Sequence, residues 1–114
     1  MPIVDIDKIR TRVGVQSEPT GTSKVHYTGK CAFYEILITT DGTNAVTLNI
    51  FDNNAASGKR IGNPNMIIAG AENNWTYSPV LPRLCQTGIY IQISVAGGGI
   101  CRASVEYDPG GVEA

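Results

Sequence analysis

GIYIQISVAGGGICRASVEY, residues 88–107, decides the fold class of this chain. Apolar side chains occupy every second position on both sides of the glycines: Ile89, Ile91, Ile93 and Val95 before them, and Cys101, Ala103, Val105 and Tyr107 after them. Such alternation is the pattern of a β-strand with one buried and one solvated face. Three glycines permit positive φ, so the stretch predicts an antiparallel hairpin that turns at AGGG. A phosphate-binding glycine loop would instead need a following helix and a lysine, and residues 100–107 provide neither.

Similar strand patterns fill the rest of the chain. We expect further strands at 11–16, 31–40, 45–52, 66–69 and 75–78, a weaker one near 24–28, and a helical turn near 3–10. Segments rich in Gly, Pro, Asn and Asp separate them, such as DGTN at 41–44 and SPVLP at 78–82. About eight short strands with regularly spaced turns are typical of an antiparallel β-sandwich. The sequence therefore predicts an all-β fold, jelly-roll-like or immunoglobulin-like.

Length and charge narrow the function classes. A chain of 114 residues suits a single domain, 1–114, in which residues 1–30 form either an N-terminal arm or the first strands. A formal net charge of -1 gives no basic field that would attract nucleic acid or an anionic membrane. No apolar run approaches the length of a membrane span, and residues 1–12 lack the apolar core of a secretory signal. We therefore expect a protein that matures in a cytosol and has neither nucleic acid nor membrane as a partner.

The cysteines predict thiols rather than a metal site. Cys31, Cys85 and Cys101 are an odd number without C-x-x-C spacing, so we expect all three to be reduced and buried. With the lone His26 they match the composition of a three-cysteine, one-histidine zinc site. Such sites pair their ligands across short knuckles, whereas only His26 and Cys31 lie close in the sequence. The pattern favours neither zinc nor another cofactor.

The loop FDNNAASGKRIG, residues 51–62, is rich in side-chain oxygens, as calcium loops are. An EF-hand loop needs a glycine at its sixth position and a glutamate at its twelfth. Counted from Asp52, these positions hold Ser57 and Asn63. Asn and Asp side chains that hydrogen-bond their own backbone explain the composition, so a turn is predicted here and not an ion site.

No catalytic constellation stands out. The chain has one histidine and lacks both G-x-S-x-G and H-E-x-x-H. A cysteine inside an apolar strand has its thiolate disfavoured, and the carboxylates are scattered along the sequence. We expect a protein without enzymatic activity.

Two longer stretches carry a resemblance. EILITTDGTNAVTLNIFDNNAASGKRIG at 35–62 and PVLPRLCQTGIYIQISVAGGGICRASVEYDP at 79–109 resemble small β-sandwich proteins of tailed-phage virions: capsid decoration (cement) proteins, head fibres, and neck or tail adaptors. The shared pattern of strands, a D-G turn, an S-G loop and a final G-I-Y hairpin covers residues 31–108. The resemblance implies a structural component of the virion, made in the host cytoplasm, that binds the major capsid protein or another virion protein. It also implies a homo-oligomer, which in cement proteins is commonly a trimer.

A carbohydrate-binding module is the alternative, because such modules use the same architecture with exposed aromatic rings as sugar platforms. Trp75 and Tyr77 are two residues apart, so they point to the same face of a short strand. They are the candidate sugar platform, although core packing is the more common fate of a lone tryptophan.

A candidate partner interface follows from the hairpin predicted across DGTN. If the apolar residues at 34, 36 and 38 share the core face with those at 46, 48 and 50, the register places Phe33 opposite Phe51 and Leu37 opposite Thr47. Phe33, Leu37 and Phe51 then lie together on the face that should be polar. They either pack under the N-terminal segment as a second core or form an intersubunit or capsid contact.

Overall fold

A computed structural model describes residues 15–109. The helical turn predicted near 3–10 and residues 11–14 of the first predicted strand lie outside this range. The described elements, in chain order, are β1 (Val15–Gln16), β2 (Lys24–Thr28), β3 (Cys31–Thr40), β4 (Val46–Phe51), β5 (Arg60–Ile68), η1 (Gly70–Glu72), β6 (Asn74–Tyr77), β7 (Arg83–Cys85), β8 (Gly88–Val95), η2 (Ala96–Gly98) and β9 (Cys101–Pro109). The two η elements are short 3-10 turns, and no helix between residues 15 and 109 is a candidate membrane span.

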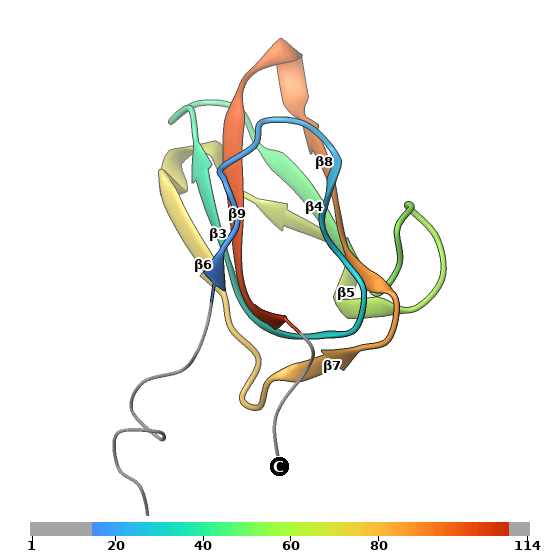
Figure 1. The fold of residues 1–114 in the computed structure, drawn as a ribbon. Coiled ribbons are helices and arrows are strands. Elements are labelled where there is room, and N and C mark those ends of the chain that lie inside the picture. Colours follow the sequence, from blue (N-terminus) through green and yellow to red (C-terminus); the bar gives the residue numbers. More distant parts are fainter. Residues whose placement is uncertain (1–14, 110–114) are drawn as a thin grey trace, which may run out of the picture.

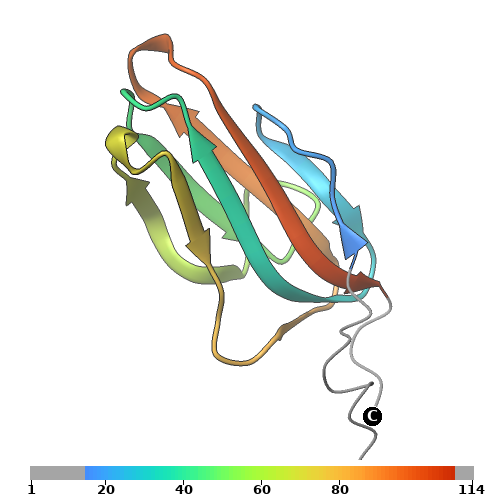
Figure 2. The same ribbon diagram turned by 90° about the vertical axis from the view of Figure 1, so that its left-hand side faces the viewer.

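The strands form two antiparallel sheets that pack face to face (Figure 1). One sheet has the order β1-β9-β3-β6, with β7 also paired to β3, and it lies in front in Figure 2. The other has the order β2-β8-β4-β5. Because β6 and β7 pair with different parts of β3, they are two pieces of one strand position. The pairs β1–β9, β2–β8, β3–β6/β7 and β4–β5 are therefore nested, which is the strand order of a jelly roll.

Two predicted hairpins are wrong. Strands β8 and β9 were expected to pair across AGGG, and β3 and β4 across DGTN, but each pair is split between the two sheets. Alternation with a period of two shows which face of a strand is buried, and it does not identify the neighbouring strand. Among residues 15–109, β4 and β5 are the one pair of consecutive strands that are hydrogen-bonded to each other.

The triple glycine at 97–99 suits a crossover between the sheets. Gly97 and Gly98 have φ angles of 62° and 71°, which glycine adopts without strain. At Gly99 a Cβ atom would lie 2.4 Å from Asn44 Nδ2 and 2.4 Å from Asp41 Oδ2. The 96–100 crossover thus packs directly on the 41–45 crossover, which explains why it carries more glycine than a tight turn needs.

Strand β5 is longer than predicted. It begins at Arg60, whereas the sequence predicted a strand only at 66–69. Gly62 (φ 79°) and Asn65 (φ 51°) adopt positive φ there, and the register with β4 shifts, so Leu48 pairs with Met66 but Ile50 with Ile61. A bulge of this kind keeps both halves of the strand paired. The three-residue β7 falls at 83–85, where no strand was predicted.

The core lies between the two sheets and draws on every long strand. Its buried members are Cys31, Phe33, Ile36, Ile38, Val46, Leu48, Ile50, Ile61, Ile68, Cys85, Ile89, Ile91, Cys101, Ala103, Val105 and Tyr107. A bulge interrupts β3 between Phe33 and Glu35. The alternation therefore changes phase, with Phe33 facing the core before the bulge and Ile36 after it.

Candidate functional site

The structure separates the three residues of the predicted interface. Phe33 is fully buried in the core, because the β3 bulge reverses its expected direction. Phe51 lies outside the core cluster but is only 3% exposed, with the Arg60 guanidinium carbon 5.0 Å from its ring centroid. Leu37 is 37% exposed and belongs to a strand of the opposite sheet. The proposed Phe33–Leu37–Phe51 surface patch is therefore wrong, since β3 and β4 are not neighbours.

Trp75 and Tyr77 do share one face of β6, with ring centroids 6.5 Å apart and planes inclined by 12°. Both are half-buried and pack against the core, and the Tyr77 centroid lies 6.4 Å from that of Phe33. A sugar ring stacks on an aromatic face that is open to solvent. These two rings instead lie on the edge strand β6 and cover the core. Their arrangement is that of core packing.

The possible metal ligands do not converge. In the part of the chain that the structure describes, no group of three or more His, Cys, Asp or Glu side chains could hold a metal ion. The Asp52 carboxylate accepts hydrogen bonds from the backbone N–H groups of Gln86, Thr87 and Gly88 at 3.0, 3.0 and 3.4 Å. Asn53 donates to the Ser57 carbonyl oxygen at 2.8 Å. The oxygen-rich loop at 51–62 is thus satisfied by its own backbone and by the 86–88 turn.

His26 and Ser17 form a second polar cluster, beside a recess of about 430 Å³. The Ser17 hydroxyl oxygen lies 2.7 Å from His26 Nδ1 and accepts the Val105 N–H at 2.8 Å. Thr20 Oγ1 lies 3.3 Å from His26 Nε2. A neutral ring with its proton on Nε2 satisfies every contact. Burial, with a smaller contribution from the nearby Lys24 cation, lowers the pKa of His26 from 6.5 to about 4. So weak a base is poorly suited to activate a serine, and the cluster instead ties the β1–β2 connection to β9.

We expect the free energy of unfolding to fall as pH is lowered from about 6.5 to about 4, since the unfolded imidazole takes up a proton in this range and the folded one does not. Because the pKa of His26 is lower in the folded protein than in the unfolded chain, His26 contributes stability at pH values above the pKa of the unfolded imidazole. This contribution is lost as the pH falls to the pKa of the folded protein. The ring is partly exposed, so after solvent screening the loss should be about 1–2 kcal/mol. Urea unfolding of wild type and His26→Gln at about pH 7 and pH 4.5 measures it. An equal fall in both proteins would contradict the prediction.

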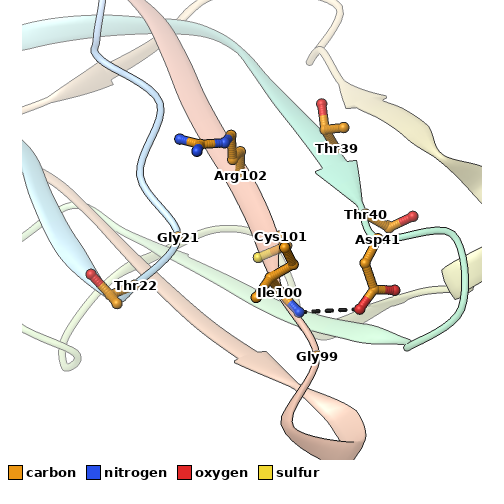
Figure 3. A pocket seen from close by; sticks show the side chains of 9 residues that line it. All are labelled: Gly21, Thr22, Thr39, Thr40, Asp41, Gly99, Ile100, Cys101 and Arg102. Atoms are coloured by element: carbon orange, nitrogen blue, oxygen red, sulfur yellow. Dashed lines mark hydrogen bonds between the residues drawn. The ribbon is translucent and has the colours of Figure 1, made fainter.

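An open recess of about 370 Å³ lies at the end of the sandwich that carries the 41–45 and 96–100 crossovers (Figure 3). Asp41 lies at its rim and accepts hydrogen bonds from the Asn44 side chain at 2.7 Å and from the Ile100 backbone N–H at 3.1 Å. These bonds, with those from the Thr43 and Asn44 backbone, hold the pKa of Asp41 well below its usual range. The carboxylate thus fastens one crossover to the other. The Arg102 side chain points away from the Asp41 carboxylate in Figure 3. The recess therefore offers no convergent set of ligand groups.

Two carboxylates do meet in the fold. Glu35 is opposite Glu106 in the β3–β9 pair, on the outer face of the sheet. The recess beside them measures about 70 Å³, which is too small to enclose a substrate. This pair has neither a cleft nor a third ligand group.

The most unusual surface is at the opposite end, in the segment between β6 and β8. Val80 is 100% exposed, Leu81 73% and Leu84 57%. We call residues 79–84 the apolar loop, and Figure 2 shows it projecting from the lower end of the sandwich. Scattered exposed apolar residues are ordinary on protein surfaces, but three within five positions of one projecting segment form a patch.

This loop is anchored on both sides. Pro79 and Pro82 fix their own φ angles. Strand β7 pairs with the start of β3, so that Leu84 is opposite Ala32, and Asp52 holds the turn that follows. The apolar groups are therefore presented by a braced backbone. In the sequence, SPVLP indicates only a turn, and the exposure of its side chains depends on a crossover that strand patterns do not reveal.

Comparison with known proteins adds nothing to these observations. No protein-family model, no curated protein and no solved structure matches this chain.

Proposed function

We propose that this protein is a non-enzymatic structural component of a tailed-phage virion, which binds a neighbouring virion protein and copies of itself through the apolar loop. The observation that carries the proposal is the exposure of Val80, Leu81 and Leu84 on a braced segment. A surface of this kind is a feature of binding proteins. It costs solubility in a free monomer, and an interaction that covers it removes that cost.

The energetics favour such a contact. Burying a valine or leucine side chain contributes about 1.5–3 kcal/mol. Association loses part of this gain when flexible groups must be ordered. Here Pro79, Pro82 and the β7 pairing restrict the loop before binding, so less of the gain is lost. Arg83 is the one charged residue of the loop, so an apolar protein surface is its expected partner.

The virion assignment rests on the resemblance of residues 31–108 to small phage β-sandwich proteins. Jelly rolls occur in viral capsid proteins and in lectins, so the sequence resemblance carries the assignment and the architecture does not. By the same resemblance the oligomer is a trimer, and the partner is the major capsid protein or another virion protein. No specific observation favours the sugar-binding alternative, because Trp75 and Tyr77 are packed against the core.

The test is the mass of the protein in solution at low micromolar concentration. We expect wild type to form a homo-oligomer, and the double variant Val80→Ser with Leu81→Ser to be a folded monomer whose association is weaker by roughly 100-fold or more, because each buried side chain contributes about 1.5–3 kcal/mol. The matched control is Ile67→Ser. Ile67 is as exposed as Leu81, at 73%, but lies on the edge strand β5, so this variant should still associate.

A second measurement addresses the virion itself. Purified particles of the phage that encodes this chain should contain it. Particles assembled with the double variant should lack it. A wild-type monomer that is also missing from the particles would overturn the proposal. Glycan binding that disappears in Trp75→Ala, with the fold intact, would favour the carbohydrate-binding alternative instead.

A further inference from the structure

Two of the three cysteines lie side by side. Cys31 begins β3 and Cys85 ends β7, and the two are direct partners in the antiparallel register. Both are fully buried, and the structure has all three cysteines as free thiols. Cys101 is opposite Thr40, at the other end of β3. It is buried as well, but no cysteine is its register partner.

The Cys31–Cys85 geometry suits a covalent bond. Directly opposed residues of an antiparallel pair have Cα atoms about 4.5–5.5 Å apart, within the range of about 4.4–6.8 Å that disulfides need. Both side chains belong to the buried core cluster between the sheets. Their side chains therefore lie on the same side of the sheet and close together, so a disulfide needs no rearrangement of the strands.

We propose that Cys31 and Cys85 are a disulfide-forming site, which closes when the protein meets a low-molecular-weight disulfide such as oxidised glutathione. In the first step the Cys31 thiolate attacks one glutathione sulfur, which forms a mixed disulfide and releases one glutathione thiolate. In the second step Cys85 loses its proton to solvent and its sulfur attacks the Cys31 sulfur, which releases the second glutathione. The protein loses two electrons and two protons, and one oxidised glutathione becomes two reduced ones.

The environment of the pair sets the order of these steps. The neighbouring Cys85 thiol lowers the pKa of Cys31, and the neighbouring Cys31 together with burial raises the pKa of Cys85. Cys31 is therefore the first thiolate, and thiolates are the attacking species. Since both sulfurs are buried, glutathione reaches them only when β7 opens or before the chain has folded.

The bond would join the segment that follows the apolar loop to β3 and would close residues 31–85 into one covalent loop. Large loops of this kind give some of the larger disulfide stabilisations, although strain reduces the gain in many proteins. A reducing cytosol would keep the pair open, and an oxidising medium would close it. The inference depends on the register alone and is independent of the proposed function.

The experiment refolds denatured, reduced protein in a buffer of reduced and oxidised glutathione, then blocks the remaining thiols and measures the mass. Trypsin leaves Cys85 and Cys101 in one peptide, 84–102, so the Cys101→Ser variant is used to assign the bond. We expect this variant to refold with both thiols lost, its 31–59 and 84–102 peptides linked, and its melting temperature raised by roughly 10 °C or more over the reduced form.

Matched variants give the controls. Cys85→Ser should refold with free thiols or glutathione adducts and without a protein disulfide, since it leaves Cys31 and Cys101 far apart. Apart from the removal of any glutathione adduct, added reductant should not change its melting temperature. If the refolded Cys101→Ser protein keeps both thiols free, or if its linked form melts below the reduced form, the proposal is overturned.

Discussion

Replacing Phe33 by alanine should destabilise the protein by about 3–5 kcal/mol, the usual cost of removing a buried phenylalanine from a core. Phe33 has no exposed surface and belongs to the main core cluster. Its ring lies 6.4 Å from that of Tyr77, which helps to close the edge of the sandwich. The loss is a large part of the total stability of about 5–15 kcal/mol that a domain has, so the variant should be partly unfolded at physiological temperature.

Leu37→Ala on the same strand is the control. Leu37 is 37% exposed on the outer face, so its removal should cost less than about 1 kcal/mol. Urea unfolding followed by fluorescence or circular dichroism measures both variants. Equal losses at the two positions would show that the β3 bulge does not turn Phe33 into the core.

The bulge marks the boundary of what the sequence could predict about the fold. Alternation correctly identified most strands, and in β4 it also identified the buried residues Val46, Leu48 and Ile50. In β3 the phase changes between Phe33 and Glu35, and nothing in CAFYEILITT indicates the extra residue. Strand partners were predicted less well, because the alternation in β8 and β9 is satisfied equally by pairing with each other or with distant strands.

The candidate site was harder to foresee than the fold. Val80 and Leu81 lie between two prolines, and such a segment predicts only that the chain turns. Their exposure follows from the route of the chain, which leaves β6, passes the end of the sandwich and returns as β7. Asp52 is the opposite case, in which the sequence resembles a site and the structure shows a turn. Its loop resembles an ion site in the sequence, yet its carboxylate is used by the backbone of residues 86–88, more than thirty positions away.

Gly70→Ala is the second substitution for which we expect a large effect, a loss of at least about 3 kcal/mol in the free energy of unfolding. Gly70 is buried in the η1 turn. An added Cβ would lie 2.3 Å from both the carbonyl carbon and the carbonyl oxygen of Thr43. These are backbone atoms, so no side-chain rotation can relieve the clash. The Thr40 hydroxyl also donates to the Gly70 carbonyl oxygen at 2.6 Å, which limits how far the turn can shift.

Gly98→Ala separates this steric effect from the general cost of losing a glycine. Gly98 has a φ of 71° but nothing within 4 Å of an added Cβ, so alanine there should cost only about 1–2 kcal/mol, the strain of a left-handed residue. Thermal and urea unfolding of both variants test the difference. If Gly70→Ala were no worse than Gly98→Ala, the η1 turn would not be packed on the 41–45 crossover. Because that crossover also carries Asp41, which binds the backbone of Ile100, a destabilised Gly70 variant should in addition lose amide-exchange protection at Ile100, and Gly98→Ala should retain it.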